Sequence, residues 1–142
     1  MISLSDNACA ESFLNAIGVS TLTSEANAIG LKNSTFMKGG GPYTTANDQA
    51  LLLGMIATGQ NFSSANQQRL LEAMKKNVFR KGIPAGVSGT VADKVGFMNG
   101  LLHDSAIVYG SHGTYVLSIM TDGASWEAIA DLAKQLDALQ AQ

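Results

Sequence analysis

Two short segments carry the side chains with the clearest chemical potential. Ser5-Asp6-Asn7 stands directly before a helical pattern, and Asp93-Lys94-Val95-Gly96 lies in the first β-branched run of the chain. Together they supply a hydroxyl, a carboxamide and an ammonium group, which can donate and accept hydrogen bonds and carry protons. Each segment also has a simpler interpretation, because Asp6-Asn7 suits a helix N-cap and Lys94 suits a solvent-facing strand position.

The elements that position the first segment are predicted to be helices. Apolar residues recur at helical spacing in four stretches, which cover residues 6–17, 24–31, 45–59 and 64–77. Ser64 and Gln67 have the spacing of a capping box at the start of the last stretch. Between the second and third helices, residues 32–43 contain Gly39-Gly40-Gly41-Pro42 and are predicted to form a loop.

The second segment opens a different pattern. Residues 90–97, 105–109 and 115–121 are rich in β-branched and aromatic side chains and are separated by turn residues, which predicts three antiparallel strands. Ser125 then caps a final helix whose apolar stripe suits one face of that sheet. The order predicts an α+β fold, with a helical part over 1–82 and a sheet with its C-terminal helix over 83–142.

Composition excludes several classes of partner. The net charge is −2, which provides no field for a phosphate backbone, so we expect no nucleic acid. We expect a cluster of basic residues (Lys75, Lys76, Arg80 and Lys81) to be a solvated helix end. No apolar run approaches the ~20 residues of a membrane span. The single cysteine, Cys9, excludes an intrachain disulfide, and its alanine neighbours predict a small buried residue.

Neither a metal nor a cofactor is predicted. His103 and His112 fall in turn-like segments without neighbours at metal-ligand spacing, apart from Asp104. The glycine run at 39–41 is not preceded by a strand, so it lacks the context of a phosphate-binding loop.

The order of elements and the two segments resemble the latter part of class A β-lactamases and the related penicillin-binding proteins. Ser5-Asp6-Asn7 is similar to the S-D-N motif of that family, and Asp93-Lys94-Val95-Gly96 is similar to its D-K-[TS]-G strand. The resemblance covers nearly the whole chain. It implies a single but incomplete domain over 1–142, which is part of the β-lactamase/transpeptidase-like fold.

The resemblance also implies roles in attack of a serine on an amide or β-lactam carbonyl. Ser5 would relay a proton to the leaving nitrogen, and Lys94 would hold Ser5 and add positive potential for a substrate carboxylate. Asn7 would bind the side-chain amide of the substrate. Val95 and Gly96 belong to the substrate-binding strand, and the backbone N–H of Phe97 would donate to the developing oxyanion.

Three departures from the family pattern bear on activity. No S-x-x-K is present, so the chain lacks the acylating serine that the family carries upstream of S-D-N. Residues 32–43 contain no carboxylate to activate the deacylating water, which favours a penicillin-binding or peptidase type with a long-lived acyl-enzyme. Val95 replaces a hydroxyl residue that contacts the substrate carboxylate, although a β-branched residue also suits the strand.

Three hypotheses remain open from the sequence. The chain is one part of a serine acyl hydrolase that acts on a β-lactam or a peptidoglycan peptide and is completed by an N-terminal segment. Alternatively, it is a non-catalytic module that binds peptidoglycan or protein. In the third, it is a truncated or engineered fragment that self-associates through an exposed sheet edge. The resemblance implies a cell-envelope location, periplasmic or extracellular.

Overall fold

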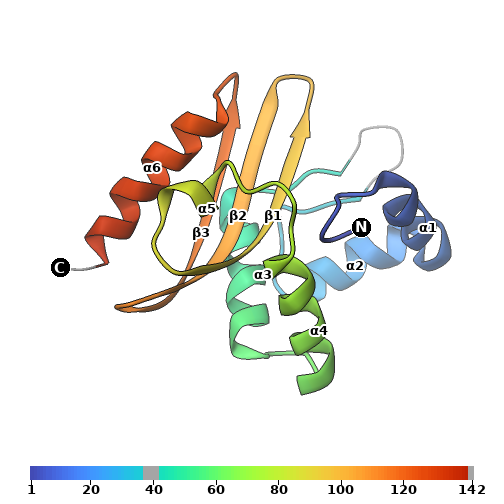
Figure 1. Cartoon of the computed structure of the whole chain (residues 1–142). Helices are drawn as coiled ribbons and strands as arrows, with labels where there is room; N and C mark the ends of the chain where they lie inside the picture. The colour runs from blue at the N-terminus through green and yellow to red at the C-terminus, as the bar shows by residue number, and fades with distance from the viewer. Residues whose placement is uncertain (37–41, 141–142) are drawn as a thin grey trace.

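The chain forms a three-stranded antiparallel sheet with helices on both faces, as Figure 1 shows. The structure is a computed structural model that describes residues 1–36 and 42–140, so the glycine run at 39–41 lies outside the described residues. The elements in chain order are α1 (Asn7–Ile17), α2 (Val19–Ala28), α3 (Ala46–Thr58), α4 (Ser64–Lys75), α5 (Ile83–Gly86), β1 (Thr90–Met98), β2 (Leu101–Gly110), β3 (Gly113–Asp122) and α6 (Trp126–Leu139).

The sheet is a meander in the order β1-β2-β3, with both pairs antiparallel. Met98 pairs with Leu101, so only Asn99 and Gly100 turn the chain between β1 and β2. Both have positive φ, 51° and 87°, as a type I′ turn requires. The predicted α+β arrangement is confirmed. The strands are longer than predicted, and His103 lies within β2 instead of in a turn.

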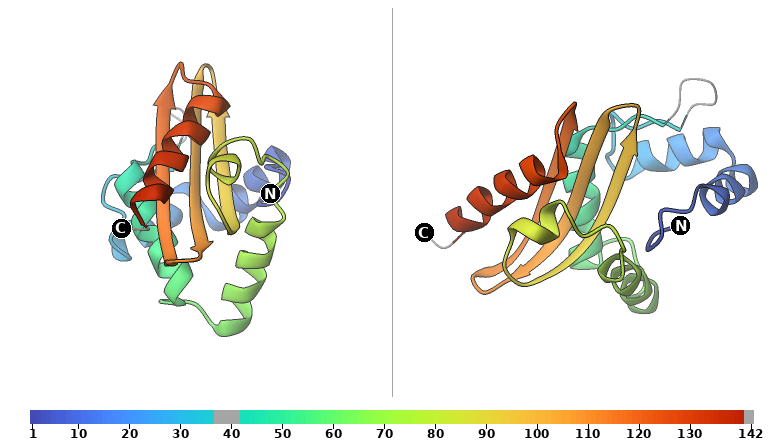
Figure 2. Two further views of the ribbon diagram at one scale, coloured as in Figure 1. Left: turned by 60° about the vertical axis from the view of Figure 1, so that its left-hand side comes forward. Right: turned by 45° about the horizontal axis from the view of Figure 1, so that its top comes forward.

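Each face of the sheet has its own apolar core (Figure 2). On one face, Val91 packs with Ile83 of α5 and Ile129 of α6. On the other, Ala92 packs with apolar side chains of α3 and α4. Because successive strand residues point to opposite faces, β1 is buried on both sides along its first half. The strand that carries Lys94 is therefore fixed in position by two layers of helices.

Side-chain caps set the starts of the helices. Asp6, Thr45 and Ser125 accept backbone N–H groups of α1, α3 and α6, as predicted for Asp6 and Ser125. The predicted capping box at Ser64 is wrong, because Ser63 caps α4. Gln67 instead donates from Nε2 to the carbonyls of Ile56 and Ala57 near the end of α3. It thereby joins α4 to α3 and satisfies carbonyl groups that a helix end leaves free.

The first two helices differ from the rest in burial. Helix α1 contains no buried residue, and α2 contains one, Ala26. Leu4, Phe13 and Ile17 are among the exposed large apolar side chains, and Cys9 is exposed, contrary to prediction. In the described residues, α1 packs mainly on α2 and leaves an apolar surface uncovered.

A cluster of buried polar groups lies between β1, β2 and the segment before α5. Asp93 and Asp104 are fully buried. Asp93 accepts from Arg80 and, at 2.7 Å, from Asn77 Nδ2. Asp104 Oδ2 accepts from the N–H of Ile83 at 2.8 Å. Arg80 is thus an ion-pair partner, which corrects the prediction that the basic cluster is only a solvated helix end.

These two carboxyl groups are difficult to keep ionised. Burial raises the pKa of Asp104 to about 6. Burial, followed by the nearby Asp104, raises the pKa of Asp93 to about 7, although Arg80 and Asn77 oppose the increase. The Oδ1 atom of Asp104 is buried and has no hydrogen-bond partner among the described residues, so the ionised form of this carboxyl group lacks part of its stabilisation. The pair is expected to hold a proton into the neutral range.

The close packing of α5 on α6 predicts a glycine requirement at position 86. A Cβ atom on Gly86 would lie 2.0 Å from the carbonyl oxygen of Ala130, whereas one on Gly54 in α3 would have no heavy atom within 4 Å. Gly86→Ala should lower the free energy of unfolding by about 2 kcal/mol through overpacking. Gly54→Ala should leave it unchanged or raise it by up to about 1 kcal/mol. Urea unfolding of both variants checks this, and equal effects would contradict it.

The buried carboxyl pair predicts that stability falls as pH rises. The folded state binds protons more tightly than the unfolded chain, so the stabilisation present at low pH is lost as pH rises through the folded pKa values, about 6 and about 7. The free energy of unfolding should therefore be lower at pH 8 than at pH 5. Asp104→Asn should reduce this difference by at least half, while Asp131→Asn, at an exposed site on α6, should not change it. An unchanged difference in Asp104→Asn would contradict this account.

Candidate active site

The segment before α1 is held in place by the end of α4. Ser3 Oγ donates to the carbonyl of Ala73 at 2.8 Å, and the N–H of Val78 donates to the carbonyl of Ser3 at 3.0 Å. Ser5 then takes a left-handed conformation with φ 53°, which is uncommon for a residue other than glycine. This turn lets Asp6 cap α1 directly afterwards and directs Ser5 toward β1.

Ser5 and Lys94 meet across 89 residues of sequence. Lys94 Nζ donates to Ser5 Oγ at 2.7 Å and to the carbonyl of Val95 at 2.5 Å. Burial lowers the pKa of Lys94, and the nearby Asp93 and Asp104 only partly oppose this effect. The result is a hydroxyl bonded to an amine whose proton is easier to remove than that of a solvated lysine. Such a pair can pass a proton to or from a bound reactant.

The outer edge of β1 exposes backbone groups on alternate residues. The carbonyls of Val91, Asp93 and Val95 accept from Arg80, Asn77 and Lys94 respectively, so they point away from β2. In an antiparallel pair the N–H and C=O of one residue point to the same side, and this side alternates along the strand. The N–H of Phe97 therefore points outward at the same edge, beyond Lys94, where it is available to an acceptor.

The other predicted site residues lie around this pair. Asn7 is exposed at the first position of α1, two residues from Ser5. The side chain of Val95 is 3% exposed and, by strand alternation, faces away from Lys94, so its carbonyl is the part at the site. Gly96 is exposed on the face of Lys94, and a Cβ there would meet only His103, at 4.0 Å. The missing side chain leaves room beside Lys94 for a ligand to approach.

Aromatic side chains adjoin the end of β1. The rings of Phe79 and Phe97 lie edge to face with centroids 5.3 Å apart, and Phe97 and Trp126 do so at 6.3 Å. Phe97 remains 51% exposed. Phe79 and Trp126 were not predicted to lie here, because nothing in their local patterns indicates that segments 18 and 29 residues from Phe97 converge on it.

A buried aspartate holds the base of the loop between α2 and α3. Asp48 Oδ2 accepts from the N–H of Asn33 and from Ser34 Oγ, both at 2.8 Å. Burial raises the pKa of Asp48, but the bonds from Ser34 and Asn33 outweigh it and leave the pKa below its usual value. Asp48 is therefore an ionised anchor for the loop. Asp48 was not predicted as an anchor, and its place three residues after the capping Thr45 is the local signal for it.

The described residues offer neither a membrane-spanning helix nor a metal-binding cluster. No helix in residues 1–36 or 42–140 is long and apolar enough to cross a membrane. Within the same residues, His, Cys, Asp and Glu side chains do not gather in groups of three or more that could hold a metal ion.

Solved structures with the same fold include proteins that are larger than this chain. PBP-A, solved also as an L158E mutant in an acyl-enzyme complex with penicillin-G, has a TM-score of 0.89 and 24% identity over 98% of this chain and 58% of its own. A β-lactamase from Streptosporangium roseum has a TM-score of 0.87 and 25% identity over 99% of this chain and 62% of its own. A putative class A β-lactamase, PenP, from Rhodopseudomonas palustris has a TM-score of 0.87 and 25% identity over 97% of this chain and 62% of its own.

The chain thus spans about three fifths of the length of these structures. A search of curated proteins finds no match. The model of the β-lactamase enzyme family matches residues 1–140, which include both the Ser5 segment and the Lys94 strand. With the same fold in the solved neighbours, this match shows that the chain belongs to the β-lactamase enzyme family.

Proposed function

We propose that the chain is the C-terminal part of a serine acyl hydrolase that opens a β-lactam or cleaves a peptidoglycan peptide through an acyl-enzyme. The observation that carries the proposal is the 2.7 Å contact between Lys94 Nζ and Ser5 Oγ. It joins two motifs of the family that are far apart in sequence and places a proton carrier beside an open strand edge. The acylating serine would come from an N-terminal segment.

In this proposal each side chain has a specific task. The incoming serine attacks the carbonyl carbon, and the N–H of Phe97 stabilises the oxyanion, a contribution of about 3 kcal/mol in acyl transfer. As the bond between the carbonyl carbon and the nitrogen breaks, Ser5 gives a proton to the leaving nitrogen. Lys94 then replaces the proton on Ser5. Asn7 binds an amide of the substrate, while Val95 and Gly96 line the site with backbone. Because β-lactams and peptidoglycan peptides are met in the cell envelope, we propose that location for the protein.

The loop anchored by Asp48 supports a peptidase type over an efficient lactamase. From Lys32 to Tyr43 the sequence contains no Asp or Glu, and the nearest carboxylate, Asp48, is already bonded to Asn33 and Ser34. Without a free carboxylate to activate water, deacylation should be slow and the acyl-enzyme should persist.

A non-catalytic binding module is the second candidate. The loop without a carboxylate and the buried side chain of Val95 both favour it, because each lacks a group used in turnover or in binding a carboxylate. It would bind peptides ending in D-Ala-D-Ala reversibly and form no covalent bond.

Penicillin G separates these candidates. The purified chain alone should form no adduct by intact-mass spectrometry, because it has no S-x-x-K serine. Co-expressed with the N-terminal segment that the proposal requires, it should be acylated stoichiometrically, and the adduct should outlast a β-lactamase control. Ser5→Ala and Lys94→Ala should each slow acylation by about 100-fold or more. Ser12→Ala and Lys81→Ala are matched controls at exposed positions and should have no effect.

Two outcomes would contradict the acyl-hydrolase proposal. An adduct on the chain alone would show a nucleophile within it, with Ser5 the first candidate. A well-folded complex that binds penicillin without acylation would favour the non-catalytic module.

We also propose that the apolar surface of α1 is covered by that N-terminal segment or, in its absence, by a second copy of the chain. Leu4, Phe13 and Ile17 are 65%, 57% and 45% exposed, and such a surface favours association. Sedimentation of the chain alone should show association that grows with concentration. Phe13→Asp should weaken it, whereas Ser12→Asp, which adds the same charge at a neighbouring exposed position, should weaken it less. A monomer at all concentrations would contradict this proposal.

A further inference from the structure

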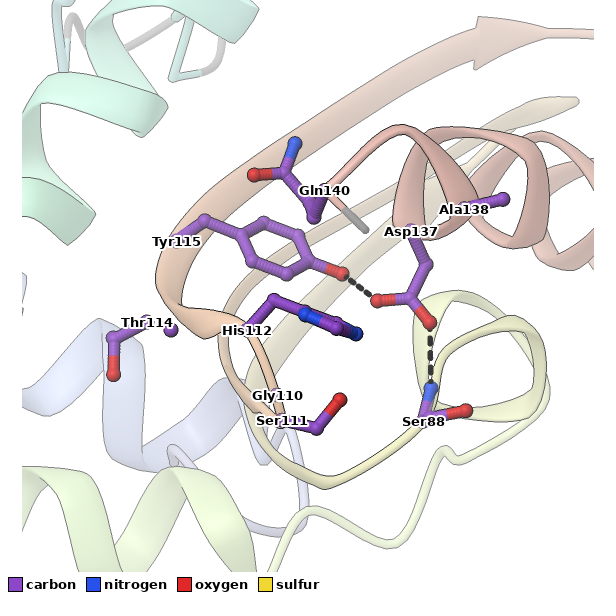
Figure 3. Close-up of a pocket in the computed structure, with 10 residues that line it drawn as sticks. Ser88, Gly110, Ser111, His112, Thr114, Tyr115, Asp137, Ala138 and Gln140 are labelled. Carbon is purple, nitrogen blue, oxygen red and sulfur yellow. Dashed lines mark hydrogen bonds between the residues drawn. The ribbon is translucent and has the colours of Figure 1, made fainter. Parts of the chain in front are cut away.

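A pocket lies at the opposite end of the sheet from Ser5 and Lys94. It has a volume of ≈ 250 Å³ and is lined by the β2–β3 hairpin, the residue before Gly89 and the last turn of α6 (Figure 3). Ser88 in its wall precedes Lys94 by six residues, or about 20 Å of extended strand. The pocket is therefore separate from the site of the proposed acyl transfer.

Asp137 is the centre of this pocket. Its Oδ1 accepts from the hydroxyl of Tyr115 at 2.5 Å, and its Oδ2 accepts from the N–H of Ser88 at 3.0 Å (Figure 3). The bonds from Tyr115 and then Ser88 lower the pKa of Asp137, so the carboxylate is negative at neutral pH. A carboxylate has about four lone-pair sites, so two remain for a ligand.

Asp137 places a negative charge near the C-terminal end of α6, where the helix dipole disfavours it. It lies in the last turn of α6, where the helix dipole is negative and a cation is preferred, yet this turn holds no basic residue. Such a departure from the usual charge preference of a helix end is expected at functional sites. Among the described residues that line the pocket, His112 is the only side chain that can carry a positive charge.

The remaining walls supply acceptors and an aromatic face. The hydroxyls of Ser88 and Ser111 and the amide of Gln140 line the pocket beside the ring of Tyr115. Gly89 fixes the approach of the Ser88 segment: its φ is 108°, and a Cβ would lie 2.3 Å from the carbonyl of Tyr109. The carboxylate is thus held in place before any ligand arrives.

We infer that this pocket binds a primary ammonium group. An ammonium has three donors, which match the free lone pairs of Asp137 and the serine hydroxyls, and its charge interacts favourably with the Tyr115 ring and the end of α6. Anions are excluded by the fixed carboxylate. A metal ion is disfavoured because, in the described residues, no second carboxylate joins Asp137.

The inference is tested by amide chemical shifts of the chain during titration with n-butylamine at pH 7.5. Ser88, the hairpin from Ser111 to Tyr115 and Gln140 should shift together and saturate in the millimolar range, since a partly exposed ion pair binds weakly. n-Butanol and butyrate, of the same length but neutral or negative, should not produce saturating shifts. This experiment involves no acyl transfer and is independent of the proposed function.

Variants assign the binding to Asp137. Asp137→Asn should weaken it by about tenfold, as for loss of a charge-assisted bond. Asp131→Asn, on an exposed part of the same helix, should leave it unchanged. If Asp137→Asn does not fold, Tyr115→Phe, which keeps the ring but removes the hydrogen bond that holds the carboxylate in place, should weaken binding a few-fold.

The ammonium group could belong to a lysine side chain or to a free small amine. Titration with a lysine derivative distinguishes the two. N-acetyl-lysine-methylamide that binds more tightly than n-butylamine would identify a lysine side chain as the target; the reverse would identify a free small amine. Either result supports the pocket. Shifts that do not saturate with either amine, or that persist equally in Asp137→Asn, would overturn the inference.

Discussion

Strand β1 is held on both faces and along most of its outer edge, and the arrangement of the site depends on this constraint. One face packs on α5 and α6, the other on α3 and α4. At the edge, Asn77 and Arg80 bond to carbonyls that would otherwise be free to pair with another strand. Only the last part, at Val95 to Phe97, remains open. The same contacts that bury the first half of the strand therefore define where a ligand can reach it.

Much of this could be predicted from the sequence because the signals are local. The change from helical to strand periodicity after residue 82 predicted the α+β order, and Ser5-Asp6-Asn7 and Asp93-Lys94-Val95-Gly96 predicted the two segments that meet. The resemblance supplied the expectation that Ser5 and Lys94 act together. The structure brings them to 2.7 Å, while their roles remain a proposal.

The features that the sequence did not predict depend on distant contacts. Ser63 instead of Ser64 caps α4, and Gln67 reaches the end of α3. Arg80 has the sequence context of a solvated cation, yet it pairs with Asp93, which is fully buried in the fold. Cys9 lies on a helix with no buried residue, so its alanine neighbours indicated small size and not burial.

The anchoring of Ser5 by the end of α4 has a consequence for local unfolding. Ser3, two residues before Ser5, bonds to Ala73 and Val78, while Ser5 itself contacts the sheet through Lys94. Fraying of the last turn of α4 would free Ser3 and favour the departure of Ser5 from its left-handed conformation. Lys94 would then lose its partner without global unfolding. The contact between Ser5 and Lys94 is thus sensitive to the stability of one helix end as well as to the stability of the whole fold.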